Sequence, residues 1–387
     1  YINLFELYDR SNQVEKFKEL LQKAESVFSN DSMIKFFLGI YQFKKKKYYE
    51  VIKTLENVKL DDQADYKYSS VKYELLAKSF DFIGSHNKAY EYFEKSNRIV
   101  DDFGKKKKID KNVFRDLVKR RIEYFVKSDF ENWNNTNFSD KRNDPIFLIG
   151  FPRSGTTLLD TILRSHSKTE VLEEKPYLIN IRHKFFKEKT LDKISNISEN
   201  QISKLQKEYF KSFNYSAEKI TIDKFPLNLI ELGFIKKIFP NSKIILALRH
   251  PLDSILSCVL TSFKINEAMA NYENLETAAN FYNEVFSLFN IYKKSLKLNY
   301  HAIKYENVVN NFDYTLRDLI KFLELEWSDN LRNFYLTASK RGIIHTPSYN
   351  QVNMPLYSNS IGRWKNYSKQ FSSVNPILSN WMKIFDY

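Results

Sequence analysis

The chain has 387 residues, of which 43% are hydrophobic and 16% aromatic, and its formal net charge at pH 7 is +14. This length predicts two domains, and the apolar content excludes a wholly disordered chain. The longest apolar runs, Ile146 to Phe151 and Ile244 to Leu248, are far shorter than the ~18 residues of a membrane span, so we expect no membrane span. The single cysteine, Cys258, cannot form an internal disulfide and fits a reducing compartment, so we expect a cytoplasmic protein.

The first residue is Tyr1 rather than Met, which leaves a preceding targeting segment open. The basic excess predicts an anionic ligand or partner. Nucleic acid is not expected, because the sequence has no zinc finger, RNP pattern or basic heptad helix. A phosphorylated or sulfated ligand accounts for the charge equally well.

Residues 1–130 contain an imperfect repeat. Aliphatic, aromatic or small residues recur at helical spacing, in steps of 34 and then 38 residues. This pattern resembles tetratricopeptide repeats, although Lys46 stands where the next repeat has Gly84. The resemblance implies an N-terminal helical solenoid that either binds a protein partner or supports the following domain; an irregular helical domain is the alternative. The recurring sets are Phe17, Leu21 and Ala24, then Val51, Leu55 and Val58, then Ala89, Phe93 and Ser96.

We expect a linking helix at 107–128 and a domain boundary in the polar stretch that follows, which gives domains 1–130 and 141–387. The second domain opens with a short apolar run, 145–149, typical of a parallel strand buried on both faces. A loop bounded by Gly150 and Gly155 comes next, followed by apolar residues at helical spacing. Backbone N–H groups at the start of such a helix bind anions.

The loop has the spacing of the nucleotide-binding P-loop, with Thr156 at the position of the usual Lys. That lysine normally reaches the β- and γ-phosphates, so its absence argues against ordinary ATP or GTP hydrolysis. Arg153 supplies a cation inside the loop. The pattern therefore predicts a phosphate-type ligand.

A second anion site is predicted about 100 residues later. Lys243 to Leu248 is a second buried strand, and Arg249 follows its end, where ligands bind in open α/β sheets. Pro251 suits the first turn of a helix, on which Ser257 adds a hydroxyl two turns later. The alternative for Arg249 is a surface salt bridge. Two separate anion sites fit a nucleoside phosphorylated at two positions better than a simple triphosphate.

These motifs resemble the sulfotransferase family, over roughly 145–367 and most closely the tyrosylprotein sulfotransferases and bacterial proteins that join tetratricopeptide repeats to a sulfotransferase domain. The resemblance implies a P-loop-like, three-layer α/β domain with a parallel central sheet. It also implies 3′-phosphoadenosine 5′-phosphosulfate (PAPS) as donor and adenosine 3′,5′-bisphosphate (PAP) as product. Implied donor-binding residues are Arg153, Ser154, Gly155, Thr156, Thr157, Lys224, Arg249, Ser257, Tyr305, Ser348 and Gln351.

The resemblance also assigns the chemistry. Glu174, which follows the predicted strand at Val171 and Leu172, corresponds to the general base, with Glu173 as the fallback. Lys224 ends a short β-like run and corresponds to the lysine that stabilises the transferring group, to which Arg153 and Ser348 also contribute. Asn353 and Met354 depart from the family, which often has a basic residue there. We expect no metal, because no histidine pair has zinc spacing.

The sequence therefore predicts a PAPS-dependent sulfotransferase acting on a protein tyrosine, a sugar or a small molecule. The lysine-rich repeats favour an acidic peptide or glycan as acceptor, and a homodimer stays open. Two alternatives remain: an atypical P-loop kinase, and a non-catalytic tetratricopeptide scaffold with a nucleotide-binding domain.

Overall fold

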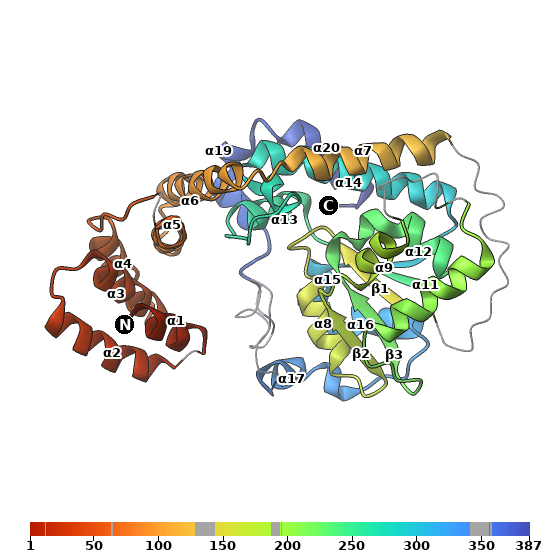
Figure 1. The fold of residues 1–387 in the computed structure, drawn as a ribbon, viewed down its shortest axis with the longest axis horizontal. Helices are drawn as coiled ribbons and strands as arrows, with labels where there is room; N and C mark the ends of the chain where they lie inside the picture. The colour runs from red at the N-terminus through yellow and green to blue at the C-terminus, as the bar shows by residue number, and fades with distance from the viewer. Residues whose placement is uncertain are drawn as a thin grey trace. The chain divides into compact units, whose positions relative to one another are not determined.

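The computed structural model describes residues 1–11, 13–62, 65–127, 144–186, 194, 196–340, 356 and 358–387 (Figure 1). These residues form two compact units. Unit 1 contains Tyr1–Phe114, Val259–Ala278 and Trp364–Ser372; unit 2 contains Arg115–Cys258, Ala279–Arg363 and Ser373–Tyr387. The predicted domains, 1–130 and 141–387, stay a prediction. Among the described residues, no helix is both long and apolar enough to span a membrane.

The N-terminal part of unit 1 is helical, and each helix contacts the next one along the chain. All nine residues of the recurring sequence sets are buried. Gly39 is packed so closely that a Cβ would lie 2.4 Å from the Leu55 side chain, as expected where two helices approach closely. The helices are α1 (Ile2–Arg10), α2 (Val14–Val27), α3 (Ser32–Lys44), α4 (Tyr48–Leu55), α5 (Tyr66–Phe82) and α6 (His86–Lys106).

The turns after α3, α5 and α6 share one backbone conformation. Lys46, Gly84 and Lys108 have positive φ angles of 59°, 80° and 59°. The residue after each donates its N–H to a carbonyl five positions earlier, as Lys47 does to Gln42 and Ser85 does to Phe80. This is the Schellman helix ending, which prefers glycine but accepts other residues. Lys46 therefore replaces Gly84 in sequence while keeping its conformation.

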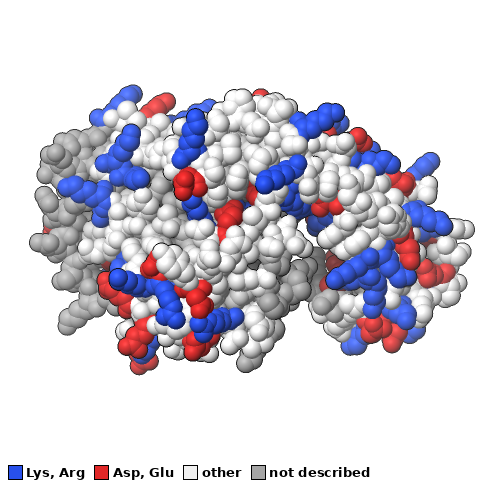
Figure 2. Space-filling view, turned by 180° about the vertical axis from the view of Figure 1, so that it is seen from behind, with Lys and Arg blue, Asp and Glu red and all other residues white. Residues whose placement is uncertain are grey.

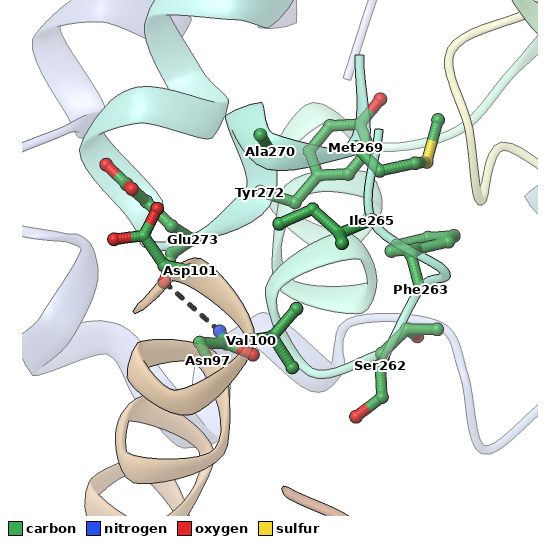
Figure 3. Close-up of a pocket in the computed structure, with 11 residues that line it drawn as sticks. Asn97, Val100, Asp101, Ser262, Phe263, Ile265, Met269, Ala270, Tyr272 and Glu273 are labelled. Atoms are coloured by element: carbon green, nitrogen blue, oxygen red, sulfur yellow. Dashed lines mark hydrogen bonds between the residues drawn. The ribbon is translucent and has the colours of Figure 1, made fainter. Parts of the chain in front are cut away.

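The segment Val259–Ala278, although distant in sequence, packs on α6 within unit 1. The Asn97 side-chain amide donates to the carbonyls of Val259 and Glu273, at 2.9 and 3.1 Å. Figure 3 shows the pocket beside this contact, where Ile265 and Tyr272 lie near Val100. The pocket is small, with a volume of about 30 Å³.

Unit 2 is built on a five-stranded parallel sheet in the order β2-β3-β1-β4-β5. The predicted strands are all present in this parallel α/β fold. The apolar runs of β1 and β4 suit strands inside the sheet, β3 lies between β2 and β1, and β2 and β5 form the edges. The strands are β1 (Ile146–Gly150), β2 (Thr169–Glu173), β3 (Ile220–Lys224), β4 (Lys243–Leu248) and β5 (Asn299–Lys304).

Helices cover both faces of the sheet (Figure 1). On one face, Leu148 and Ile222 pack with Leu159 of α8 in a continuous apolar core. On the other, Phe147 packs against Tyr209 of α11 and Phe239. Unit 2 includes α8 (Thr156–Arg164), α9 (Tyr177–Phe185), α11 (Glu199–Lys211), η2 (Pro226–Glu231), α12 (Leu232–Ile238), α15 (Tyr305–Asn310), α16 (Phe312–Phe322), η4 (Asp329–Leu331), α17 (Phe334–Lys340) and α20 (Asn375–Ile384).

Four of the described helical segments have residues in both units: α7 (Lys111–Lys127), α13 (Pro251–Val259), α14 (Leu275–Ser295) and η5 (Arg363–Tyr367). The short helices η3 (Met269–Tyr272) and α19 (Ser368–Phe371) belong to unit 1. The predicted linking helix, 107–128, corresponds to α7. It begins later than predicted because Lys108 turns the chain, and the Asp110 side chain then accepts the N–H of Asn112.

Candidate active site

The predicted site residues gather at one edge of the sheet in unit 2. Each of the five strands ends at or next to one of them: Gly150, Glu174, Lys224, Arg249 and Tyr305. Because the strands are parallel, their carboxyl ends share an edge, where open α/β sheets bind ligands. Topology alone therefore brings together residues from distant parts of the sequence.

The loop after β1 requires both of its glycines. A Cβ on Gly150 would lie 2.6 Å from the Ala247 carbonyl oxygen and 2.7 Å from Ser154 Oγ. Gly155 has a φ of 95°, and a Cβ there would lie 2.9 Å from the ring of Tyr305. The loop thus runs against β4 and Tyr305 at distances that only glycine allows.

Helix α8 begins at Thr156, directly after the loop. Gly155 is its N-cap residue, so no side chain caps this helix end. The first N–H groups of a helix have no intrahelical acceptor, and the helix dipole makes this end attractive to anions. Thr156 and Thr157 are buried here, and the arrangement has the form of an anion-binding loop.

Arg249 binds the loop directly. Its guanidinium donates to the Arg153 carbonyl at 3.1 Å and to the Ser360 carbonyl at 2.5 Å. Its charge lies 5.1 Å from the centre of the Tyr305 ring. The Arg249 side chain is buried and has these structural partners, so the surface salt bridge considered from the sequence is not its role.

The two predicted anion sites meet at Arg153. Arg153 has a φ of 68°, and its Nε donates to the hydroxyl of Ser257, on α13, at 3.0 Å. The neighbouring Cys258 lies close to both arginines: burial raises the pKa of its thiol, and Arg153 and Arg249 counter this rise only in part. The cation of the first loop is thus directed towards the second anion motif.

Glu174 and Lys224 form an ion pair. Lys224 Nζ lies 2.7 Å from Glu174 Oε1; the lysine side chain is fully buried and that of Glu174 is 34% exposed. The Glu174 N–H also donates to the Lys224 carbonyl at 2.8 Å. Glu174 has a φ of 45°, a conformation that costs a non-glycine residue energy and is often found at functional sites.

Asp223 precedes Lys224, and its side chain lies on the opposite face of the sheet. The carboxylate is fully buried and accepts a hydrogen bond from the Tyr209 hydroxyl at 2.7 Å. Burial raises the pKa of Asp223 to about 7, although the Tyr209 hydrogen bond and the Lys224 charge oppose the rise. A proton-accepting group thus lies directly behind the ion pair.

The structure thereby brings together Arg153, Ser154, Gly155, Thr156, Thr157, Glu174, Lys224, Arg249, Ser257 and Tyr305. Ser348 and Gln351 lie outside the described residues. Sequence reasoning missed Ser360, which acts through its backbone and leaves no sequence signal. It also missed Asp160, which lies 3.7 Å from Lys224; a charged residue between the apolar pairs Leu158-Leu159 and Ile162-Leu163 was the available signal.

Residues 145–329 match the family model described as the sulfotransferase family. The chain is 26% identical over 334 residues to an uncharacterised protein of Aquifex aeolicus, covering 81% of this chain and 41% of that protein. It is 26% identical over 202 residues to protein-tyrosine sulfotransferase A of Caenorhabditis elegans, covering 48% of this chain and 51% of that protein. The chain thus spans about half the length of these curated relatives.

Among solved structures, the sulfotransferase domain from the curacin biosynthetic pathway aligns with a TM-score of 0.44 and 21% identity. The alignment covers 62% of this chain and 98% of that domain.

Proposed function

Residues 145–329 form a domain of the sulfotransferase family, and on this premise we propose that the protein transfers a sulfuryl group from PAPS to an acceptor hydroxyl. The hydrogen bond from Arg249 to the Arg153 carbonyl carries the proposal, because it joins the two anion-binding elements. A nucleotide with phosphate groups at the 5′ and 3′ positions of one ribose presents two anions close together. Adjacent sites match that ligand.

Buried polar atoms support the fit of such a ligand. Ser154 Oγ and Arg249 Nε are both buried and have no hydrogen-bond partner among the described residues. A buried polar atom without a partner costs free energy, so these atoms favour a ligand that supplies acceptors. Ser154 lies in the first anion loop and Arg249 in the second motif, so each predicted site has one such atom.

The donor supplies an activated sulfuryl group, and the protein's residues hold it and move one proton. The loop at 150–157 and Lys224 hold the phosphosulfate, while Arg249, Ser257 and Arg153 hold the 3′-phosphate. Glu174 accepts the acceptor's hydroxyl proton as that oxygen bonds to sulfur and the bond between sulfur and the phosphate oxygen breaks. Lys224 and the start of α8 stabilise the charge on the phosphate. The product nucleotide is PAP.

Lys224 compensates for the lysine that the loop lacks. Thr156 occupies that position, but Lys224 Nζ lies 3.7 Å from Asp160 Oδ2 on α8, one turn after Thr156. The ammonium therefore reaches this helix from β3 instead of from the loop. Ser348 and Gln351 remain our proposed further contacts to the reacting group.

The helical part of unit 1 is proposed to be a tetratricopeptide-like solenoid that binds an acidic partner or acceptor, such as an acidic peptide or glycan. The repeated buried positions and the shared turn after α3, α5 and α6 support the solenoid. A groove of about 570 Å³ between α5 and α6 is lined by Lys95, Arg98, Lys105 and Lys106, but also by two aspartates. Because the lining carries both signs of charge, the groove favours an acidic ligand only moderately. Basic and acidic side chains are also interleaved over the face shown in Figure 2.

The proposed base is tested by Glu174→Gln, with radiolabelled PAPS and a screen of tyrosine peptides, sugars and small phenols. We expect sulfuryl transfer to fall about 100-fold or more, because general-base catalysis contributes about that much. PAP binding in calorimetry should remain. Glu170→Gln, on β2, the strand that precedes Glu174, is the control and should transfer normally. If Glu174→Gln transferred the sulfuryl group at the parent rate, Glu174 would not be the base. Turnover by the parent protein would exclude the alternative of a non-catalytic scaffold.

A further inference from the structure

Lys224 is surrounded by carboxylates. Its ammonium lies 2.7 Å from Glu174, 3.7 Å from Asp160 and 3.9 Å from Glu173. The side chains of Lys224 and Asp160 are fully buried, whereas Glu174 is the most exposed of the three acids. The ammonium thus has a near partner at the open side and two more distant ones in the interior.

Asp160 is held in place by a cation of its own. Its Oδ1 accepts a hydrogen bond from Arg164 Nε at 3.0 Å, one turn further along α8. Its Oδ2 is the oxygen closer to Lys224. Such a pair contributes little on an exposed helix surface, but here the carboxylate is fully buried. Arg164 therefore fixes the direction in which Asp160 presents its second oxygen.

The Glu174–Lys224 pair is in conflict with the role proposed for Glu174. While Lys224 Nζ lies 2.7 Å from Glu174 Oε1, the ammonium occupies the oxygen that would accept the proton of the substrate hydroxyl. Lys224 must therefore leave Glu174 before Glu174 acts as the base. A buried ammonium cannot leave one carboxylate at low cost unless another anion remains beside it.

We propose that Asp160 is a positioning residue for Lys224, an inference that rests on the proposed sulfuryl transfer. Asp160, oriented by Arg164, retains the ammonium at the end of β3 while the ammonium moves from Glu174 to the anionic donor. Glu174 is then released to accept a proton only when the donor is bound. Donor binding and activation of the base are thereby coupled through one lysine.

The test uses the full-length protein and [³⁵S]PAPS with water as the acceptor, so no acceptor has to be known. Asp160→Asn keeps the side-chain shape and removes its charge, which leaves Lys224 with Glu174 as its near partner and Glu173 as the more distant one. We expect kcat for PAPS hydrolysis to fall about 10- to 100-fold, the usual range for loss of a residue that orients a catalytic group. KM for PAPS and the calorimetric affinity for PAP should each change less than about threefold, because the loop and Arg249 bind the nucleotide.

A double variant separates positioning from simple loss of structure. If Asp160 acts by releasing Glu174, Asp160→Asn has no further effect on kcat in a Glu174→Gln background. A purely structural role would lower kcat in both backgrounds. Arg164→Gln should reduce kcat in the same direction but less, because Asp160 keeps its charge and loses only its orientation.

Three outcomes are decisive. If the parent protein binds no PAP, the proposed function fails, and this inference fails with it. Suppose that the parent protein binds PAP and hydrolyses PAPS. The positioning role alone is then overturned if Asp160→Asn keeps kcat within twofold of the parent, or if Asp160→Asn lowers kcat by the same factor with Glu174 present and in the Glu174→Gln background. If Asp160→Asn does not fold, Arg164→Gln decides, and an unchanged kcat in that variant overturns the inference.

Discussion

Arg153 donates a hydrogen bond from Nε to the hydroxyl of Ser257 at 3.0 Å, although 104 positions separate the two residues in sequence. Arg153 lies in the loop after β1, and Ser257 lies on the helix after β4. Because β1 and β4 are neighbours in the parallel sheet, their following segments meet. One contact therefore connects the two elements from which we propose the nucleotide site is built.

Ser257→Ala removes the hydroxyl that faces Arg153 and, in our proposal, the 3′-phosphate. We expect the affinity for PAP to fall about tenfold or more, because hydrogen bonds to charged groups contribute about 1.5–3 kcal/mol. The affinity for AMP, which lacks the 3′-phosphate, should hardly change. Calorimetry with both nucleotides makes the comparison, and Ser165→Ala, beyond the far end of α8, is the control. An equal loss for both nucleotides would assign Ser257 to the loop structure only.

The interior of the sheet was easier to predict from sequence than its edges. The predicted run 220–224 and the strand 243–248 coincide with β3 and β4. The β4 run is almost wholly apolar, as expected for a strand buried on both faces, whereas β3 is marked by the β-branched residues at 220–222. At the edges, only Val171-Leu172 of β2 and 302–304 of β5 were recognised. Asn299, Tyr300 and His301 of β5 are exposed or half-buried, so they give no apolar signal.

The site shows a similar limit. Arg153, Glu174, Lys224 and Arg249 were recognisable because motif spacing and strand ends mark them. Asp160 is marked only by being a charged residue between apolar pairs, because its contact with Lys224 depends on how α8 packs on the sheet, which spacing along the chain does not encode.

A buried ion cluster holds the part of α7 that belongs to unit 2. Arg121 Nη2 lies 2.8 Å from both carboxylate oxygens of Glu231, and Arg182 Nε lies 3.3 Å from one of them. Glu231→Gln would leave two buried guanidinium groups poorly compensated, so we expect a loss of about 3–5 kcal/mol in the free energy of unfolding. Urea denaturation measures this, with the exposed Arg332→Gln as a control expected to cost about 1 kcal/mol or less.

The same cluster has a defined pH dependence. Burial raises the pKa of Glu231, but Arg121 and Arg182 lower it by more, so its pKa lies below the usual 4.5. A depressed carboxyl pKa stabilises the fold above the unfolded pKa, and this stability is lost as the pH falls through the folded value. The stability difference between parent and Glu231→Gln should therefore shrink in acid; a constant difference would contradict the ionic role.

Asp223→Asn should stabilise the protein at alkaline pH. The pKa of Asp223 is raised from 3.8 to about 7, so the folded state binds more protons than the unfolded state between these values. Stability therefore falls as the pH rises through this window, by on the order of 4 kcal/mol in total. Urea denaturation at pH 5 and pH 8 should show a smaller decline for Asp223→Asn than for the parent. Equal declines would place the Asp223 pKa near its ordinary value.

The central claim is that two neighbouring cationic elements bind the 5′ and 3′ groups of one nucleotide. Calorimetry of the parent protein with PAP, AMP and magnesium ATP tests it most directly. We predict that PAP binds about 100-fold more tightly than AMP, since the 3′-phosphate gains at least one charged hydrogen bond from each of Arg249 and Arg153. PAP should also bind more tightly than magnesium ATP. Equal affinities for PAP and AMP, or a preference for magnesium ATP, would contradict the account and favour a kinase.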